Sequence, residues 1–230
     1  MRNLIDIFYK IPKRKTRFHD GENIFVGTLK CFFYFFSFII MLHNKLKFEK
    51  ILPQINFSSL HIFNKIIKSK KLKVLEFGSG YSTIWWANKN ITEIVSIENN
   101  EFWFKKIFNK IKDLQLDEKA KIIKTNHYVD NKKFDLIIID GGDRLNHLKN
   151  TLLNNMHSET IIYYDNTDRI NHGDEKRIPI EYFKEWSYNN NLHSFTARNF
   201  TPYGLYVTAG IFVFPSFKIY QNITKGIIKI

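Results

Sequence analysis

The first group of residues suited to chemistry is a glycine turn after an apolar run. Residues 72–77 read as a buried strand, and Gly78 and Gly80 follow it directly. Two glycines let the backbone bend tightly and bring its N–H groups close to a ligand, and the helix expected next adds a partial positive charge. We therefore expect a nucleotide-like cofactor here, with Ser79 and Ser82 as further candidate contacts.

The residues around this turn indicate the kind of cofactor. A dinucleotide fingerprint reads Gly-x-Gly-x-x-Gly, and its third glycine allows close packing around a pyrophosphate. Thr83 occupies that third position, whereas Glu76 lies two residues before Gly78. A carboxylate there faces a cationic amino-acid moiety more naturally than a phosphate. An oxidoreductase that binds NAD(P) in a Rossmann fold stays open as an alternative.

Acidic residues also follow three later apolar runs. Glu98 ends the second expected strand, 20 residues beyond Gly78, where a Rossmann-like fold places the carboxylate that binds ribose hydroxyls. Asp140 and Asp165 end two continuous apolar runs, which are typical of central strands buried on both faces. Ligands of open α/β sheets bind outside the carboxyl ends of the strands, so we expect these acids to share one site.

Taken in order, these motifs resemble the class I S-adenosylmethionine-dependent methyltransferases, whose first motif reads acidic-x-Gly-x-Gly. The stretches that carry the resemblance are 76–83 with Trp85-Trp86, then Ile139-Asp140-Gly141, then 165–169. Within that class they are similar to a largely uncharacterised bacterial group. The resemblance covers about residues 50–214 and implies methyl transfer from S-adenosylmethionine, with O-methylation of a small-molecule or glycan acceptor.

The resemblance also implies roles for individual residues. Gly78 and Gly80 would pack against the methionine and ribose part of the cofactor, and Glu76 would face its amino group. Glu98 would bind the ribose hydroxyls. Asp140 would lie nearest the reacting centre, and it is a candidate catalytic residue together with Asp165.

A divalent ion is a further implication. Asp140 with Asp165 and Asn166 resembles the ligand set of the metal-dependent O-methyltransferases, and Mg²⁺ or another hard cation prefers such oxygen ligands. The sequence departs from that subfamily at Gly141-Gly142 and at Arg144, which itself could supply the positive charge. Strand-end Asp and Asn residues also cap helices or tighten turns, so both readings stay open.

Two arginines follow the strand-end motifs. Arg144 and Arg169 could clamp an anionic substrate, because a guanidinium group matches the geometry of carboxylate and phosphate. Alternatively, each arginine pairs with its neighbour, Asp143 or Asp168. Trp85 and Trp86 are expected to pack in the core.

The resemblance implies an α/β fold: a Rossmann-like, doubly wound sheet of seven strands, mostly parallel with an antiparallel last strand, plus a helical N-terminal extension. The hydrophobic periodicity gives the positions of its elements. The expected strands are 72–77, 93–97, 120–125, 134–139, 161–164, 192–197 and 206–214, and the expected helices after the glycine turn are 81–89, 102–114, 144–155 and 179–190. Residues 126–133 are too few for the helix that usually covers this crossover.

Composition limits the partners. The chain of 230 residues has 35 Lys+Arg against 22 Asp+Glu, a formal charge of +13 that favours nucleic acid, anionic lipid or an acidic substrate. The lysines form no dense tract or nucleic-acid motif, so nucleic acid is not favoured. Cys31 is the single cysteine, which indicates a reducing compartment, and we expect a cytoplasmic protein.

The N-terminal 49 residues are basic and hydrophobic and precede the domain expected at 50–214, with a peripheral tail at 215–230. An uncharged, Phe-rich run, Cys31–Leu42, reaches back to residue 24 if one lysine is allowed. A bilayer needs about 20 apolar residues, so contact of residues 24–42 with a membrane surface and a plain packed helix both stay open. A non-catalytic, membrane-associated binding module is the third functional reading.

Overall fold

The computed structural model describes residues 14–47 and 52–225, and its central element is a seven-stranded sheet with the order β3-β2-β1-β4-β5-β7-β6. Its strands are β1 (Lys73–Phe77), β2 (Glu93–Glu98), β3 (Ala120–Lys124), β4 (Leu136–Ile139), β5 (Ile161–Tyr164), β6 (His193–Thr201) and β7 (Gly204–Phe214). Strands β1 to β5 are parallel, and β7 is antiparallel to both β5 and β6. The predicted fold class and the antiparallel last strand are confirmed.

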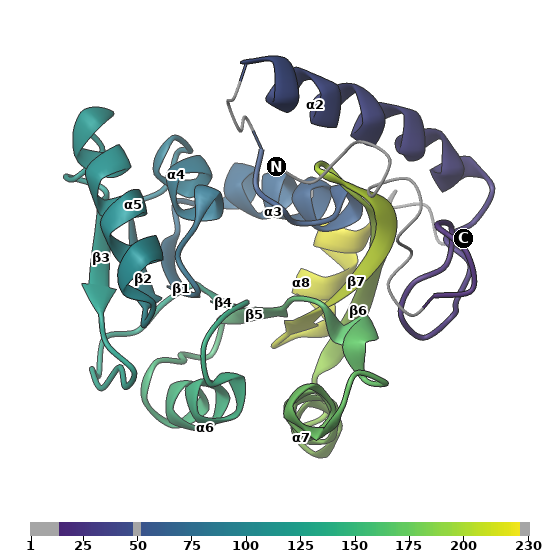
Figure 1. The fold of residues 1–230 in the computed structure, drawn as a ribbon. Coiled ribbons are helices and arrows are strands. Elements are labelled where there is room, and N and C mark those ends of the chain that lie inside the picture. The colour runs from purple at the N-terminus through teal and green to yellow at the C-terminus, as the bar shows by residue number, and fades with distance from the viewer. Residues whose placement is uncertain (1–13, 48–51, 226–230) are drawn as a thin grey trace.

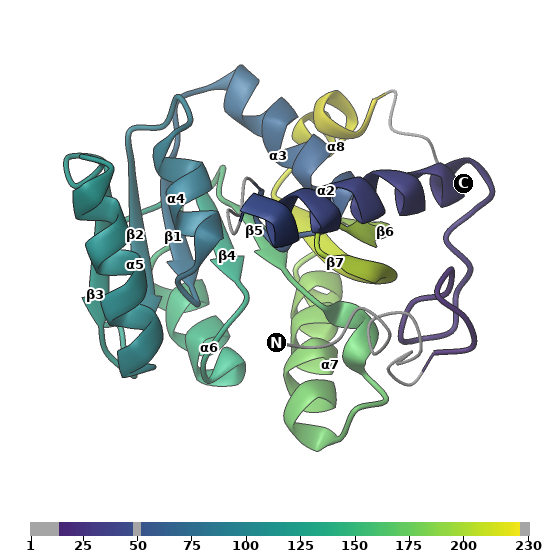
Figure 2. The ribbon, with the colours of Figure 1, turned by 45° about the horizontal axis from the view of Figure 1, so that its top comes forward.

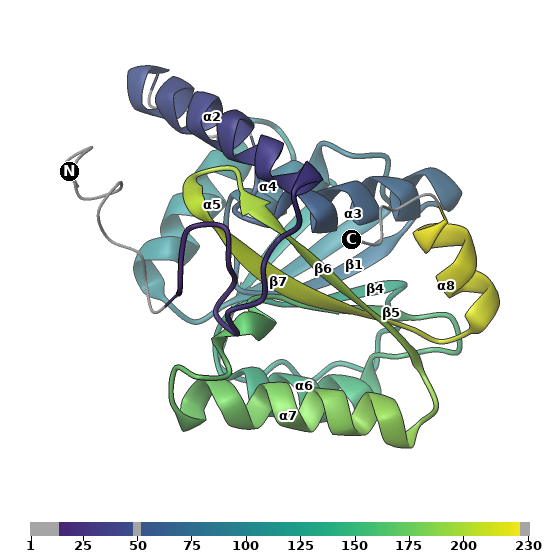
Figure 3. The same ribbon diagram turned by 90° about the vertical axis from the view of Figure 1, so that its right-hand side faces the viewer.

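Helices cover both faces of this sheet (Figure 1). They are η1 (Leu29–Phe32), α2 (Phe33–Lys47), α3 (Phe57–Ser69), α4 (Tyr81–Ala87), α5 (Glu101–Asp113), α6 (Arg144–Asn154), η2 (Thr167–Arg169), α7 (Asp174–Asn189) and α8 (Phe217–Thr224). One apolar cluster joins α3, α4, α5 and α8 to the sheet, and a second joins α6 and α7 to its other face, as Figure 3 shows. The result is a three-layer α/β sandwich.

The continuous apolar runs are explained by this sandwich. All four residues of β4 are buried, and they alternate between the two faces. Ile138 packs in the cluster that contains Phe63 and Trp86, whereas Ile139 packs in the cluster that contains Leu148. A strand that is covered on both faces needs apolar side chains on both, so its sequence does not alternate.

Some element boundaries differ from the sequence predictions. Helix α3 lies before the glycine turn and is capped by Asn56, whose side chain accepts a hydrogen bond from the Ser59 N–H at 2.9 Å. Helix α7 begins at Asp174 instead of Pro179, because Asp174 and Glu175 suit the positive end of a helix dipole. Residues 125–135 contain no helix between β3 and β4, as the short spacing predicts.

The described part of the N-terminal segment, residues 14–47, packs on the antiparallel edge of the sheet. Phe18 and Tyr34 place their rings 5.7 Å and 5.6 Å from the ring of Phe200 on β6. Val26 is buried beside Val207 on β7. Figure 2 shows α2 crossing above this hairpin and α3. In the described residues, no helix is both long and apolar enough to cross a membrane.

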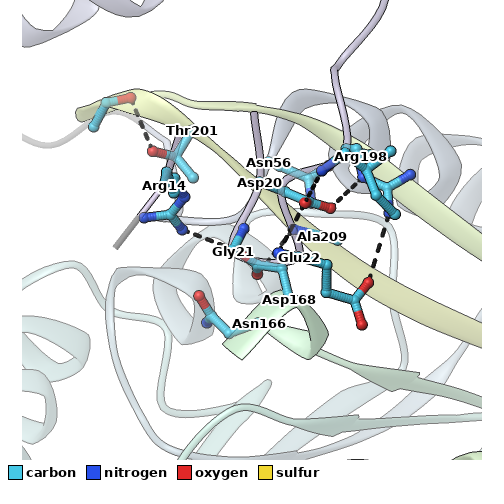
Figure 4. A network of polar contacts seen from close by, with 12 residues as sticks. Arg14, Asp20, Gly21, Glu22, Asn56, Asn166, Asp168, Arg198, Thr201 and Ala209 are labelled. Atoms are coloured by element: carbon cyan, nitrogen blue, oxygen red, sulfur yellow. Dashed lines mark hydrogen bonds and ion pairs between the residues drawn. The ribbon is translucent and has the colours of Figure 1, made fainter. Parts of the chain in front are cut away.

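A buried polar network fixes this segment (Figure 4). The carboxylate of Asp168, in η2, accepts hydrogen bonds from Arg14 Nη2 at 2.9 Å, from the Gly21 N–H at 2.9 Å and from the Ala209 N–H at 3.1 Å. Beside it, Asp20 pairs with Arg198 of β6. One carboxylate therefore connects the N-terminal segment, η2 and β7.

The C-terminal region also packs on the domain. Helix α8 begins after Ser216, whose side chain accepts a hydrogen bond from the Ile219 N–H, and its Ile223 is buried in the cluster that contains Phe63. The sequence indicates only a tail here, because a helix of eight residues gives a short periodic signal. The division into 1–49, 50–214 and 215–230 stays a prediction.

We predict that Asp168→Ala strongly lowers the free energy of unfolding. The substitution leaves the Arg14 guanidinium and two N–H groups without their acceptor in a site where Arg14 and Asp168 side chains are 2% and 0% exposed. Removing one partner of a buried ion pair typically costs about 3 to 5 kcal/mol. Urea denaturation followed by circular dichroism measures the change.

The matched control is Glu159→Ala, which removes an exposed pair with Lys70 at 3.4 Å. This variant should unfold close to the wild-type midpoint, because surface ion pairs add little stability. Equal losses in the two variants would contradict the role assigned to Asp168.

Candidate functional site

A cleft of about 260 Å³ lies at the carboxyl edge of the sheet, where β1, β2 and β4 end. Most of the predicted cofactor contacts line it together: Gly78, Ser79, Gly80, Ser82, Glu98 and Asp140. Four further residues complete the lining: Gln54, Ile55, Tyr81 and Trp103. The cleft is thus built from the glycine turn, two strand ends and the segment before α3.

Gly78 holds the turn in a conformation that other residues rarely adopt. Its φ is +100°, and a Cβ there would lie 2.7 Å from the backbone nitrogen of Gly141. That nitrogen donates a hydrogen bond to the Phe77 carbonyl at 2.7 Å. The ends of β1 and β4 therefore touch backbone to backbone, and this contact needs glycine at position 78.

The presence of a glycine at position 80 has a different reason. Its φ of −169° is extended backbone that any residue adopts, and a Cβ there would meet only Ser82 Oγ, at 3.7 Å. Neither conformation nor packing within the chain requires glycine. A side chain at this position would take up space at the cleft, so the glycine keeps open the space next to the N-terminus of α4.

The carboxylate of Glu98 is fixed at the cleft wall. Oε1 accepts a hydrogen bond from the Asn100 N–H at 2.8 Å, and Oε2 accepts one from Ser79 Oγ at 3.3 Å. An ionised carboxylate has about four acceptor positions, so it can accept further hydrogen bonds. This geometry suits recognition of neighbouring hydroxyl groups.

Glu76 does not line the cleft. Its side chain lies behind the turn, 1% exposed, and accepts hydrogen bonds from Thr83 Oγ1 at 2.5 Å and Ser96 Oγ at 2.7 Å. Burial raises the pKa of Glu76 to about 7, although these hydroxyl groups oppose the shift. The carboxyl group connects β1, β2 and α4, a position that does not favour the predicted direct contact with a cofactor amino group.

Arg144 joins the ends of β4 and β5. Its guanidinium donates to the Asp140 carbonyl, to the Asp165 carbonyl at 2.7 Å and to Asp140 Oδ1 at 3.3 Å. It also lies over the Tyr164 ring, 5.3 Å from the ring centroid. Burial lowers the pKa of Arg144, but Asp140 and the other neighbouring groups raise it by more, so the pKa lies above its ordinary value. A permanent positive charge thus lies between the two strand ends.

Asp165 is buried below this arginine. Oδ1 accepts a hydrogen bond from Tyr163 Oη at 2.5 Å, and Oδ2 accepts one from the side-chain amide of Asn166. Burial and the nearby Asp140 raise the pKa of Asp165. Both of its carboxylate oxygens therefore accept hydrogen bonds from other residues of the chain, and Asp165 does not line the cleft.

The predicted metal ligands do not fit an ion in this arrangement. Asp165 is engaged by Tyr163 and Asn166, and Arg144 is bonded to Asp140 where a cation would bridge the strand ends. Among the described residues, no group of three His, Cys, Asp or Glu side chains is placed to hold a metal. The physical reason for this poor fit is the charge of Arg144, which already neutralises the carboxylate of Asp140.

The two predicted substrate arginines differ in their contacts. Arg144 is engaged as described, with Asp140 and not with Asp143, which instead caps α6. Asp168 is bound by Arg14, so it does not neutralise its neighbour Arg169. The half-buried Arg169 guanidinium has no hydrogen bond or ion pair with another described residue, and it lowers the pKa of Asp165.

Several cleft residues carry little sequence signal. Gln54 and Ile55 lie in an irregular segment before α3, and nothing in their types or spacing indicates a site. Trp103 is different, because its indole is 36% exposed and follows Glu98 by five residues. An aromatic residue at the start of the helix after a strand-end acid is a usable signal for a flat binding surface.

We predict that Glu76 makes stability fall as pH rises. Its pKa of about 7 lies above the ordinary value of 4.5, so between these values the folded state holds more protons than the unfolded state. The contribution is complete below pH 4.5 and is lost as pH rises through 7, with a size of up to about 3 kcal/mol. Urea denaturation over this pH range measures it.

Glu76→Gln should remove the part of the pH dependence that comes from Glu76. The slope that remains combines Asp165, whose raised pKa also lowers stability as pH rises, with His147, whose pKa is lowered to about 4 by burial and whose titration raises stability between pH 4 and 6.5. Glu181→Gln, an exposed change on α7, should keep the wild-type slope. An unchanged slope in a folded Glu76→Gln protein would show that Glu76 does not titrate in this range.

Comparisons with known proteins agree with the fold. No family model and no curated protein sequence matches the chain. Among solved structures, the O-methyltransferase from Bacillus cereus in complex with SAH has 19% sequence identity and a TM-score of 0.57, and the match covers 78% of this chain and 90% of that one. The O-methyltransferase TomG from Streptomyces achromogenes, in complex with SAM, has 14% identity and a TM-score of 0.56 over 78% and 88%.

Spermidine synthase from Thermotoga maritima also matches, with 12% identity and a TM-score of 0.52 over 73% of this chain and 62% of that one. At such identities the likeness concerns the fold, and one fold supports more than one reaction. The chain therefore has the Rossmann-like fold seen in these SAM-dependent O-methyltransferases, as its motifs predict.

Proposed function

We propose that the protein is an S-adenosylmethionine-dependent methyltransferase that methylates an oxygen atom of a small-molecule acceptor. The observation that carries the proposal is the cleft, in which the glycine turn, Glu98 and Asp140 meet at the carboxyl ends of β1, β2 and β4. Two structures with the same fold are O-methyltransferases in complex with SAH or SAM. The fold and the cleft support the same class of reaction.

The lining residues suit the parts of this cofactor. Glu98 is placed to accept hydrogen bonds from the ribose hydroxyls, and the exposed indole of Trp103 offers a flat apolar surface for the adenine ring. The open space at Gly80 and the hydroxyl groups of Ser79 and Ser82 suit the methionine part. No metal is required for these contacts.

The bound cofactor would supply an electrophilic methyl group, and the residues of this chain orient the acceptor towards it and exclude water. Asp140 Oδ1 accepts from Arg144, which leaves Oδ2 for the acceptor hydroxyl. As the new C–O bond forms and the C–S bond breaks, the hydroxyl proton passes to Asp140 Oδ2. The side chain of Asp140 is 34% exposed, which gives an acceptor access to it.

Arg144 replaces a divalent ion in this proposal. A cation at the ends of β4 and β5 would hold the acceptor oxygen close to Asp140, and the guanidinium already provides a positive charge at that place. The alternative, that Mg²⁺ binds Asp140, Asp165 and Asn166, requires Arg144 and the Asn166 amide to move away.

The acceptor is best described by its charge. Arg169 is the last residue of η2, near Asp165, and its guanidinium can bind an anionic group of the acceptor. Hydroxy acids carry both the hydroxyl and the charge, and so do phenols and glycans that bear an acidic group.

We also propose contact between residues 24–42 and a membrane surface.

Binding of S-adenosylhomocysteine, and not of NAD, tests the cofactor. Calorimetric titration should detect the first and not the second, and binding of NAD alone would favour an oxidoreductase.

Glu98→Ala should weaken binding of S-adenosylhomocysteine by about 1 to 3 kcal/mol, the cost of leaving hydrogen-bonding groups without partners in a buried site. Gly80→Val should weaken it too, because its side chain enters the cleft, while the melting temperature stays close to wild type.

Gly78→Ala is the matched control for Gly80→Val. It should lower the melting temperature, because the positive φ and the contact with Gly141 exclude a Cβ. Wild-type affinity in folded Glu98→Ala and Gly80→Val proteins would place the cofactor elsewhere. If S-adenosylhomocysteine binds but no phenol, hydroxy acid or glycan is methylated, the result would favour a non-catalytic binding module.

Arg144 should make methyl transfer independent of divalent ions. With an acceptor found by screening with labelled cofactor, EDTA should leave the rate unchanged, whereas Arg144→Met should lower it at least about tenfold, since one positioned cation stabilises developing charge by a few kcal/mol. Melting curves with and without Mn²⁺ give a second readout: the ion should not shift the wild-type transition. Loss of activity in EDTA, restored by Mg²⁺, would instead support the metal.

A further inference from the structure

A second hollow, of about 510 Å³, lies between α2, α3 and α4 and shares no lining residue with the cofactor cleft. Its lining contains three aromatic residues, Phe33, Phe57 and Trp85, with Leu52 and Leu60. Trp85 is therefore only half-buried, whereas its neighbour Trp86 is in the core as predicted. An apolar hollow of this size on the outside of the helical layer plays no part in the proposed reaction.

This hollow continues into an exposed apolar stripe on α2. The ring of Phe33 lies 6.0 Å from that of Phe36, and Phe36 lies 5.4 Å from Phe32 at the end of η1. Phe32 is 67% exposed and Phe35 57% exposed, and the stripe continues along the same side of the helix through Ile39 and Leu42. Residues three and four apart share one helix face, so these side chains form a single outward stripe.

The opposite side of α2 holds the helix in place. Ser37 and Met41 are buried, and α2 contacts β6 and β7. Figure 3 shows α2 at the outer rim of the molecule, on the side of the sheet away from α6 and α7. The apolar stripe is therefore presented by a helix that is docked on the domain.

The ionisable residues that line the hollow in the described part of the chain are all basic. They are Lys30, His61 and Lys89, and no described Asp or Glu lines it. Lys89 lies over the Trp85 ring at 4.5 Å, so its charge is kept at the rim. Lys65 and Lys68 on α3 add further positive charge near His61, and Arg198 on β6 adds it near Lys30.

We propose that this apolar stripe and its basic hollow form a docking face for a membrane surface that carries anionic lipids. The inference deepens the proposed membrane contact of residues 24–42 by adding the charge of the lipid and two lysines that recognise it, Lys30 in η1 and Lys89 after α4. The aromatic side chains enter the boundary between head groups and acyl chains, and the lysines contact the anionic head groups. No described helix is long and apolar enough to span, so the contact is parallel to the surface.

A second copy of the chain fits this face less well. A two-fold contact would bring two basic hollows of the same charge together, and the chain has a formal charge of +13. An anionic bilayer offers both an apolar layer and the opposite charge. Charge complementarity therefore selects the lipid surface as the partner.

The test is co-sedimentation of the full chain with phosphatidylcholine vesicles that contain or lack phosphatidylglycerol. The protein should pellet with the anionic vesicles at low salt and much less with neutral ones. A double variant, Phe32→Ser with Phe36→Ser, should reduce binding about tenfold by removing two inserting rings. Lys89→Glu should reduce binding to anionic vesicles and leave residual binding to neutral vesicles unchanged.

Tyr188→Ser is the matched control, because Tyr188 is an aromatic residue even more exposed than Phe32 and Phe36, at the end of α7 on the other side of the sheet. It should bind vesicles as the wild type does. Circular dichroism and S-adenosylhomocysteine binding should be unchanged in all variants, so loss of vesicle binding and loss of the cofactor site are separate results.

Four outcomes would overturn the docking face: no pelleting of the full chain, equal pelleting with neutral vesicles, an equal loss in Tyr188→Ser, or a self-association without lipid that the phenylalanine variants abolish. The last would identify a second copy of the chain as the partner. Failure to bind S-adenosylhomocysteine with intact vesicle binding would count against the methyltransferase alone.

Discussion

The site depends on a backbone contact between the ends of two neighbouring strands. Gly78 has a φ of +100°, and a Cβ there would lie 2.7 Å from the nitrogen of Gly141. With no side chain between them, β1 and β4 converge where each leaves the sheet, and Asp140 comes to the edge of the glycine turn. Because the contact involves backbone atoms only, rotamer changes cannot relieve an added Cβ. The position of the acidic group relative to the cleft is thus set by main-chain geometry.

The parts of this arrangement that sequence could predict are those set by local pattern. The runs Leu136–Ile139 and Ile161–Tyr164 are apolar at every position, which is the pattern of a strand covered on both faces. The 20-residue spacing from Gly78 to Glu98 spans one helix and one strand, so it brings both residues to the same edge. The strand positions and most of the cleft residues were predicted from these short-range signals, and the strand directions from the family resemblance, whereas the strand order was not predicted.

What sequence could not predict depends on contacts between distant segments. Gln54 lines the cleft only because α3 packs on the sheet, and no periodicity encodes that placement. The ion pair of Arg14 with Asp168 joins residues 154 positions apart. Glu76 has a residue type that suits a ligand contact, yet strand alternation turns its side chain to the face that α4 covers, so Thr83 and Ser96 become its partners. The residue type alone therefore does not indicate to which face of the sheet a side chain points.

The turn after β5 links the cofactor cleft to the N-terminal segment. Within five residues it contains Asp165, whose carbonyl accepts from Arg144 beside the cleft, and Asp168, whose carboxylate binds Arg14 and the backbone of Gly21. The segment held by Asp168 leads directly into α2, which carries the apolar stripe. Arg169 lies in the same turn, so an acceptor held there would approach from the side on which the N-terminal segment packs. One short turn thus contains both the arginine that we propose binds the acceptor and the carboxylate that holds the segment leading to the proposed docking face.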